Sequence, residues 1–554
     1  MRGPPTDGGE GTGDGAGARN SKYRLGIEPR LVVHSLAMAN KKTKGRAGGG
    51  RSRTVDSTPA TCFLGLDVGT SSVKACVVDL RGRVVARASE PLKLRAPQPG
   101  WAEQNPTDWW KATALVCKRA VAATRGGRAA IGAVGISGQM HSSVFLDRGG
   151  RVIRPALLWC DGRTTAQCRT ITERAGEQNL RTWVSNPALE GFTLPKVLWL
   201  RDEEPAAFAK LAKVLLAKDY IRYCLSGQMA SEPSDAAGTL MFDVVYRRWS
   251  SEMLAAVDLA ADLLPDLGGS TEVLGRVTTR AATATGLLAG TPIVGGGADN
   301  ACGAVGVGVV APGTAVVSWG TSGTVLTPMA SPAVDPGMRA HTFCHAVPDT
   351  WYVMGVMLSA GAAFAWHQRE LAKELARDKN AADTLNREAA RIAVGAEGLT
   401  FLPYLQGERT PHRDASARGA FAGLSLSHTR AHLTRAVLEA ICFGLRDSLE
   451  IIQALGIDVP ELLVTGGGAK APFVRQLQAD IYGKPVVPVE QEEGPAFGAA
   501  LLAAVGAGAY PDVPSATRAT LRRKPAQRPR DDVHAAYTEP YARYSRLYRA
   551  LRTM

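Results

Sequence analysis

Two short glycine turns in this sequence have nearly the same wording, and both carry groups that can bind an anion. The first, G-L-D-V-G-T-S-S, begins at Gly65, and the second, V-S-W-G-T-S-G-T, begins at Val317. Such turns present N–H and O–H donors to phosphate oxygens, and a nearby carboxylate can hold a divalent cation between phosphates. Asp67 stands just before the first turn, whereas the matching position in the second is the uncharged Ser318. We interpret the pair as one phosphate-binding half-site that was used twice and then specialised.

A second carboxylate follows a run of three glycines. In P-I-V-G-G-G-A-D-N-A-C-G, an expected strand runs into the glycines, and Asp299 and Asn300 begin a helix of small residues. Glycines let the backbone approach a ligand closely. An Asp here can accept the proton of a substrate hydroxyl whose oxygen attacks phosphorus, or it can serve only as the N-cap of the helix. The neighbouring glycines and Asn300 favour a catalytic site.

A third glycine turn, T-G-G-G-A-K, begins at Thr465 between an expected strand and an expected helix. A helix N-terminus after a glycine turn suits a nucleotide, although glycine runs also form ordinary tight turns. The sequence has no G-x-x-x-x-G-K-[ST] motif, and no G-x-G-x-x-G follows a first strand. These absences argue against a P-loop NTPase and against a Rossmann dinucleotide-binding unit.

The elements around these turns are expected to follow the same order twice: hairpin, helix, strand and glycine turn. In the first half we expect a hairpin from residue 61, a helix over 106–124 and a strand ending at 138; in the second, a hairpin around 320, a helix over 432–455 and a strand ending at 466. A repeated order of this kind predicts two α/β domains that face a cleft, with a boundary near residues 310–313.

Composition narrows the function classes. The 554 residues can form two cores, because single cores stop growing near ~250–300 residues. The net charge is +14, and residues 1–60 and 518–554 hold +13 of it, so the body of the chain has no basic groove and no nucleic-acid partner is expected. Residues 1–60 are too poor in large apolar groups to order themselves and are predicted to be a disordered basic extension, within which Met38 is an alternative start.

Cysteine usage and hydropathy indicate the compartment. The nine cysteines are scattered and never form a C-x-x-C pair, which favours a reducing compartment and argues against a zinc site. No apolar run reaches the ~18 residues that span a bilayer, and the N-terminal region has no signal-peptide core. We therefore expect a cytoplasmic protein without a membrane partner.

Longer motifs add a resemblance to a known family. The stretches G-F-T-L-P-K-V-L-W-L-R-D-E (191–203) and G-A-F-A-G-L-S-L-S-H-T-R-A-H-L-T-R-A-V-L-E (419–439) resemble the two signatures of the FGGY carbohydrate kinases, members of the actin/hexokinase-like ATPase superfamily. Within that family the sequence is most similar to the xylulokinases. That detail comes from G-Q-M-H-S-S (138–143), L-L-W-C-D-G-R (157–163), S-D-A-A-G-T (234–239) and F-L-P-Y-L-Q-G-E-R-T-P-H (401–412).

The resemblance implies a fold and an activity. The fold is α/β, with two actin/hexokinase-like (ribonuclease H-like) ATPase domains around a central cleft: residues 61–310 bind and phosphorylate the sugar, residues 311–515 bind the nucleotide, and 516–554 form a basic, partly helical C-terminal segment. The implied reaction is the ATP- and Mg²⁺-dependent phosphorylation of D-xylulose to D-xylulose 5-phosphate in xylose catabolism. Three alternatives stay open: a kinase for another pentulose, pentitol or polyol, a non-catalytic nucleotide-switched binding protein, and a homodimeric rather than monomeric enzyme.

The resemblance also assigns roles by position. Asp299 is the implied proton acceptor, and Asp67 supports the phosphates and, with Asp299, the Mg²⁺. Sugar-binding roles fall on Met140, His141, Asp299 and Asn300, and ATP- or phosphate-binding roles on Thr70, Ser71, Lys74, Gly320, Thr321, Gly467, Gly468 and Ala469. His141 has an alternative as an internally satisfied histidine at a strand end. Two departures are small: Cys160 replaces a common Asn, and Ala298 replaces a common Gly.

Overall fold

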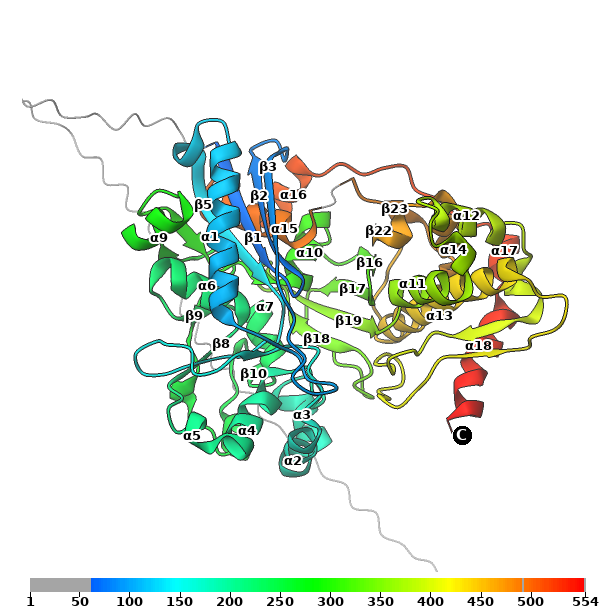
Figure 1. Cartoon of the computed structure of the whole chain (residues 1–554), viewed down its shortest axis with the longest axis horizontal. Coiled ribbons are helices and arrows are strands. Elements are labelled where there is room, and N and C mark those ends of the chain that lie inside the picture. The colour runs from blue at the N-terminus through cyan, green and yellow to red at the C-terminus, as the bar shows by residue number, and fades with distance from the viewer. Residues whose placement is uncertain (1–60, 491–492, 553–554) are drawn as a thin grey trace, which may run out of the picture. The chain divides into compact units, whose positions relative to one another are not determined.

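The computed structural model describes residues 61–490 and 493–552, so the predicted disordered extension and Met38 lie outside the described residues. Two mixed β-sheets organise the described part of the chain (Figure 1). The first sheet contains, in spatial order, β13 (Val273–Arg276), β14 (Pro292–Val294), β5 (Ile131–Gly138), β1 (Cys62–Val68), β2 (Ser72–Asp79) and β3 (Val84–Pro91), with β15 (Gly297–Ala298) paired to β5. The second contains β18 (His341–Cys344), β19 (Trp351–Met357), β17 (Gly323–Met329), β16 (Ala315–Trp319), β22 (Leu462–Gly466) and β23 (Val486–Pro488).

The two sheets repeat one topology. β1 pairs antiparallel with β2 and parallel with β5, while β16 pairs antiparallel with β17 and parallel with β22. The order β3-β2-β1-β5-β14 therefore corresponds to β19-β17-β16-β22-β23. Parallel neighbours need a crossover connection, and helices α1 (Pro106–Ala123) and α13 (Arg430–Ala454) lie in the matching places. The expectation of hairpin, helix and strand given twice is confirmed.

Local chemistry explains the predicted helix boundaries. Asn105 caps α1, because its side-chain oxygen accepts the N–H of Thr107 at 3.0 Å, and Pro106 occupies the first turn, where its missing N–H costs nothing. α13 is buried along most of its length in the second core. Both helices match the expected ranges to within two residues at each end.

The other helices and the short strands connect these sheets. The helices are α2 (Thr165–Ala175), α3 (Glu177–Trp183), α4 (Thr193–Glu203), α5 (Pro205–Phe208), α6 (Ala217–Ser226), α7 (Pro233–Ala236), α8 (Ser251–Ala256), α9 (Thr279–Thr285), α10 (Asp299–Val307), α11 (Gly361–Leu371), α12 (Ala381–Ala389), α14 (Pro472–Tyr482), α15 (Gly494–Gly506), α16 (Val513–Thr520), α17 (Asp531–Ala536) and α18 (Thr538–Leu551). The short paired strands are β4 (Glu103–Gln104) with β7 (Ala156–Leu157), β6 (Val144–Leu146) with β8 (Lys213–Leu215), β9 (Ala230–Ser231) with β12 (Asp266–Leu267), β10 (Phe242–Asp243) with β11 (Arg248–Trp249), and β20 (Thr400–Leu402) with β21 (Ala420–Ala422). Within residues 61–490 and 493–552, none of the helices is long and apolar enough to cross a membrane.

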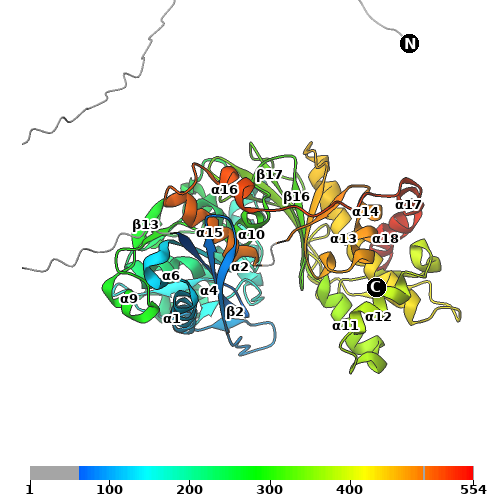
Figure 2. The ribbon, with the colours of Figure 1, turned by 90° about the horizontal axis from the view of Figure 1, so that it is seen from above.

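Helix α15 comes late in the sequence but packs on the first sheet, beside β1 and β2 (Figures 1 and 2). The approach is close enough to require glycine in two strands. A Cβ on Gly65 would lie 1.8 Å from the carbonyl oxygen of Ala496, and one on Gly135 would lie 2.0 Å from that of Ala499. The chain between residues 311 and 515 thus contributes to both cores.

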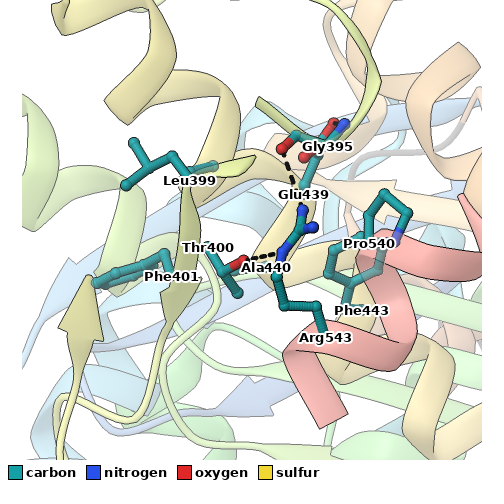
Figure 3. A pocket seen from close by; sticks show the side chains of 10 residues that line it. Gly395, Leu399, Thr400, Phe401, Glu439, Ala440, Phe443, Pro540 and Arg543 are labelled. Carbon is teal, nitrogen blue, oxygen red and sulfur yellow. Dashed lines mark hydrogen bonds between the residues drawn. The ribbon is translucent and has the colours of Figure 1, made fainter. Parts of the chain in front are cut away.

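The C-terminal helix α18 packs against α13 and β20 of the second half. Tyr544 and Tyr404 share a hydrogen bond of 3.0 Å between their hydroxyls, and Arg543 Nε donates to Thr400 Oγ1 at 2.9 Å. The cavity left beneath Arg543 and Glu439 measures only about 10 Å³ (Figure 3). That volume holds about one water molecule, so this region is a packing interface rather than a ligand site.

Candidate active site

The first sheet brings the two predicted catalytic carboxylates to one edge. Asp67 on β1 lies opposite Ser137 on β5, and Ser137 lies opposite Gly297 on β15. Neighbouring strands are about 4.8 Å apart, so Asp67 and Gly297 are separated by about 10 Å. Asp299 follows directly after β15 as the first residue of α10. The topology thus places Asp67 and Asp299 near each other at the end of the sheet.

Burial raises the pKa of both carboxyl groups. Asp67 is 7% exposed, and its Oδ1 has no hydrogen-bond partner among the described residues. Burial raises the pKa of Asp67 to about 6, although Lys74, directly opposite on β2, partly offsets this shift. Burial, with a smaller contribution from the Asp67 charge, raises the pKa of Asp299 to about 7. Both groups therefore titrate close to neutral pH.

The structure decides the capping question for Asp299. Ala298 is the N-cap residue of α10, and Asp299 is its first helical residue. The Asp299 carboxylate accepts hydrogen bonds from the backbone N–H of Asn300 at 2.8 Å and from its side-chain amide at 3.1 Å. Asp299 is half-buried and lines a cavity, so its carboxylate can reach a ligand there.

Met140 and His141 follow β5 and lie close to Asn300. The amide of Asn300 is 3.6 Å from Met140 Sδ. His141 has a left-handed backbone with φ of 67°, its Nδ1 bonds the carbonyl of Gly238, and its ring packs 4.7 Å from that of Phe192.

The protonation state of His141 follows from its surroundings. Burial, and secondarily the charge of Lys196, lowers its pKa to about 3, so the ring is neutral at pH 7. Nδ1 then carries the proton donated to Gly238. Nε2 makes no hydrogen bond to any described residue and is available as an acceptor. The alternative of an internally satisfied histidine therefore holds for Nδ1, which bonds Gly238, but not for Nε2.

The residues predicted for the first phosphate loop have different surroundings. Thr70 Oγ1 donates to Gln139 at 3.1 Å and accepts from the Trp159 indole at 2.9 Å, which ties it to the G-Q-M-H segment. Ser71 and Lys74 are exposed. Sequence reasoning did not assign Gln139 or Trp159 to the site, although both stand inside quoted motifs, which were the available signal.

A cavity of about 770 Å³ joins Asp299 and Asn300 to the second half of the chain. Its other walls include Gly467 and Ala469 of the third glycine turn. Lys470 and Lys524 also line it, and their ammonium groups make no ion pair or hydrogen bond with any residue that the structure describes. Neither lysine was given a role from the sequence, although Lys470 is the last residue of the quoted T-G-G-G-A-K turn; no motif marks Lys524.

An apolar cavity of about 590 Å³ adjoins the first one, and the two share Gly467 and Lys470 as lining residues. Gly320, Thr321 and Gly468 line this second cavity. Its apolar walls come from Trp319, Phe364, Leu438 and Val474. Asn386 of α12 adds a buried amide whose Oδ1 has no partner among the described residues.

The predicted residues therefore divide into two groups. Asp299, Asn300, Gly320, Thr321, Gly467, Gly468 and Ala469 line the two adjoining cavities, whereas Asp67, Thr70, Ser71, Lys74, Met140 and His141 line neither. Over residues 61–490 and 493–552, no three His, Cys, Asp or Glu side chains gather into a metal-binding group.

The comparisons with known proteins agree with this architecture. The model of the FGGY family of carbohydrate kinases matches the chain with its N-terminal domain over residues 62–306 and with its C-terminal domain over residues 315–507. The chain belongs to this family. The FGGY fold and the family predicted from the sequence motifs are thus confirmed, and the family implies that ATP is the phosphoryl donor.

Individual FGGY relatives cover most of this kinase. It is 39% identical over 485 residues to the xylulose kinase of Bacillus subtilis, a match that covers 88% of this chain and 96% of the relative. The xylulose kinase structure from Rhodospirillum rubrum has a TM-score of 0.82 at 31% identity and covers 89% of this chain and 99% of its own. A gluconate kinase structure from Lactobacillus acidophilus has a TM-score of 0.83 at 26% identity, with coverage of 88% and 98%. The fold alone therefore does not select the sugar.

Proposed function

We propose that this FGGY kinase transfers the γ-phosphoryl group of ATP to the terminal hydroxyl of D-xylulose and forms D-xylulose 5-phosphate. The observation that carries the proposal is the shared cavity: Asp299 from the first half and the glycine turn at Gly467 from the second half line one space. A proton acceptor and a nucleotide-binding turn must meet in this way for phosphoryl transfer. The substrate follows from the 39% identity to a xylulose kinase over most of the chain.

Asp299 is the proposed general base. A base works best when its pKa lies near the working pH, and the pKa of Asp299 is raised to about 7. In the reaction, a bond forms between the sugar oxygen and the γ-phosphorus while the bond from that phosphorus to the β,γ-bridging oxygen breaks. The hydroxyl proton moves to Asp299, and ADP leaves with the electrons of the broken bond.

The two adjoining cavities suit the two ends of ATP. The apolar cavity beside Trp319 and Leu438 has the walls that a purine base prefers, and Asn386 offers an unpaired buried amide to its edge. The phosphates would extend past Gly467 toward Asp299, where Lys470 and Lys524 supply unpaired positive charge. In this arrangement, residues 61–310 hold the sugar and residues 311–515 hold most of the nucleotide.

The carboxylates fit a magnesium ion bound together with the nucleotide. Mg²⁺ in kinases is usually held by one or two carboxylates and by substrate phosphates rather than by a full protein cage. Asp67 Oδ1 is buried without a partner and Asp299 lies near it, so these two side chains would hold the ion. When bound, it would neutralise charge on the phosphates.

The sugar is proposed to lie against Met140, His141 and Asn300. The neutral His141 can accept a hydrogen bond from a sugar hydroxyl at Nε2, and the Asn300 amide can donate one to a second sugar oxygen. The phosphate-loop roles of Thr70, Ser71 and Lys74 are retained as proposals, Thr70 acting through its bonds to Gln139 and Trp159.

All nine cysteines lie within the described ranges and are free thiols, which supports a reducing, cytoplasmic location.

A substrate panel tests the function. ADP release would be followed with D-xylulose, D-ribulose, L-xylulose, xylitol, glycerol and gluconate at matched concentrations. We expect the highest kcat/KM with D-xylulose and a product phosphorylated at C5. Preference for another sugar would correct the substrate, and ADP release that is independent of every sugar would contradict the kinase assignment.

A further inference from the structure

A buried ionic cluster lies directly behind the turn that carries Asp299. We define the cluster as Lys218, Asp219, Arg222 and Glu232, whose side chains are completely buried. The Lys218 ammonium lies 2.7 Å from Asp219 and 3.4 Å from Glu232, and Arg222 bonds Asp219 as well. Removing one partner from such a cluster would leave an unpaired buried charge, which is strongly unfavourable. The ion pairs therefore hold these four side chains in a fixed arrangement.

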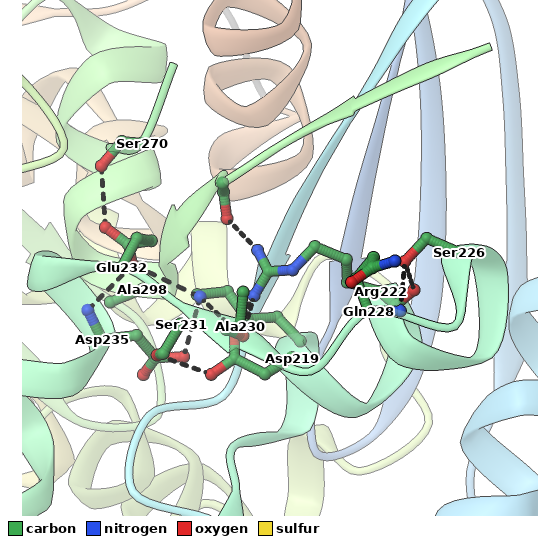
Figure 4. A network of polar contacts seen from close by, with 12 residues as sticks. Asp219, Arg222, Ser226, Gln228, Ala230, Ser231, Glu232, Asp235, Ser270 and Ala298 are labelled. Carbon is green, nitrogen blue, oxygen red and sulfur yellow. Dashed lines mark hydrogen bonds and ion pairs between the residues drawn. The ribbon is translucent and has the colours of Figure 1, made fainter. Parts of the chain in front are cut away.

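The cluster reaches the glycine turn through three connections. Arg222 donates to the carbonyl of Gly295 at 2.9 Å. The N–H of Gly296 donates to the carbonyl of Ser270 at 2.8 Å, and the Ser270 hydroxyl donates to Glu232 at 2.7 Å. Figure 4 shows Glu232 with Ser270 and Ala298 on either side of it.

The third connection is the one nearest to Asp299. The N–H of Ala298 donates to the Ser234 hydroxyl at 3.0 Å, and that hydroxyl donates to Glu232 at 2.8 Å. Ala298 is the N-cap residue of α10 and has no side chain with which to cap the helix. Ser234 is fully buried and belongs to the S-D-A-A-G-T motif, for which the proposed reaction has no other use.

We propose that Ser234 is a positioning residue: its hydroxyl couples the peptide that precedes Asp299 to the buried cluster and so fixes where the base points. This inference rests on the proposed function, because it gives the Asp299 carboxylate a defined target. A base displaced by about 1 Å can lose up to about 10² in rate. Ser234 itself touches neither substrate in this scheme.

Ser231 offers a matched control. Its hydroxyl is buried and donates to Asp219 of the cluster at 2.7 Å, but its side chain makes no hydrogen bond to residues 295–299. Removing the Ser231 hydroxyl takes one buried hydrogen bond from Asp219. Removing the Ser234 hydroxyl takes one from Glu232 and also leaves the Ala298 N–H without its acceptor. Of the two substitutions, only Ser234→Ala removes a hydrogen bond to the peptide that precedes Asp299.

The test compares steady-state kinetics of Ser234→Ala, Ser231→Ala and the wild type. For Ser234→Ala we expect kcat to fall about 10–100-fold while KM for sugar and for ATP stays within about twofold, since only the orientation of the base changes. Ser231→Ala should keep kcat within about twofold, although it too loses a buried hydrogen bond of the cluster. Ser234→Cys, which keeps the shape of the side chain but hydrogen-bonds only weakly, should share the loss, and Ser234→Thr, which keeps the hydroxyl, should retain most of kcat.

The outcomes separate the two proposals. A wild type that turns over D-xylulose, with Ser234→Ala and Ser231→Ala equally active or equally impaired, overturns the positioning role and leaves the kinase function intact. If Ser234→Ala does not fold, the same comparison is made with Ser234→Cys. A wild type that phosphorylates none of the sugars in the panel overturns both, because Asp299 then has no proton to accept.

Discussion

Two carboxyl groups with raised pKa values form the proposed catalytic centre of this chain. Asp67 and Asp299 are separated by well over two hundred residues in sequence, yet the register of β1, β5 and β15 brings them to one sheet edge. Burial is the main cause of both raised pKa values, to about 6 and about 7. The same burial that makes Asp299 a usable base makes it unfavourable for folding once it is ionised.

The first prediction concerns Asp299→Asn. The amide keeps the size of the side chain but cannot accept the proton, so sugar-dependent turnover should fall by about 10²–10⁴, the usual contribution of a positioned base. ATP affinity should stay near that of the wild type. Coupled ADP detection and calorimetry measure the two effects, with Asp266→Asn, an exposed residue on β12, as the control. Retention of more than about half the wild-type turnover would remove Asp299 from the role of base.

The second prediction follows from the sign of the pKa shifts. The pKa of Asp299 in the fold is about 7, above its ordinary value of 3.8, so its contribution to stability is present at low pH and is lost as pH rises to about 7. Asp299→Asn cannot ionise, and its melting temperature should therefore exceed that of the wild type by more at pH 8 than at pH 5. In the wild type, kcat/KM should fall as pH drops through about 7, because the base becomes protonated. A stability difference that is the same at both pH values would mean that Asp299 titrates normally.

At the scale of elements, helices with a clear apolar period could be predicted from the sequence, whereas contacts between residues far apart in the chain could not. The apolar period of α13 and the Asn105-Pro106 start of α1 are local signals, and both helices lie where the sequence indicates. The sequence also predicted two domains that face a cleft, and Asp299 and the Gly467 turn do line one cavity. It did not reveal the Ala298–Ser234 bond or the unpaired Nε2 of His141, because these depend on partners far away in sequence.

The third prediction belongs to the packing of α13 under α18. Glu439, at the end of the second FGGY signature, is buried and accepts hydrogen bonds from Arg435 at 2.7 Å, Tyr537 at 2.9 Å and the N–H of Gly395 at 3.0 Å. Glu439→Gln leaves Arg435 buried without its counter-charge, so the free energy of unfolding should fall by about 3–5 kcal/mol.

The surface pair of Glu370 with Arg369 supplies the control for that prediction. Its side chains are 39% and 67% exposed, and Glu370→Gln should change the free energy of unfolding by less than about 1 kcal/mol. Denaturant unfolding of both variants measures the difference. Equal stability of the two would mean that solvent reaches the Glu439–Arg435 pair. Because neither Glu439 nor its hydrogen-bond partners line either cavity, kcat of folded Glu439→Gln should remain near that of the wild type.

At the scale of the whole described chain, the repeated topology was visible in the sequence, but the crossing of α15 was not. The sequence of α15, G-P-A-F-G-A-A-L-L-A-A-V-G, is apolar on all sides. This pattern predicts that the helix is buried, but it does not indicate which sheet the helix packs on. Gly65 and Gly135 are the strand positions against which α15 packs. A glycine inside a strand pattern predicts that another backbone comes close, but it does not identify that segment. α15 links the second half of the sequence to the sheet that carries Asp67.

The last prediction concerns coupling between the two substrates. The sugar residues Met140 and His141 belong to the first half, the proposed base-binding cavity belongs to the second, and Asp299 lines the space that joins them. Transfer requires donor and acceptor to approach to near contact with water excluded, so each ligand should favour the arrangement that the other needs. D-xylulose should therefore tighten ATP binding, and ATP should tighten D-xylulose binding by the same factor. Calorimetric titration with a non-hydrolysable ATP analogue measures each affinity with and without the other ligand. Equal affinities in the two conditions would contradict coupling and leave the kinase function standing.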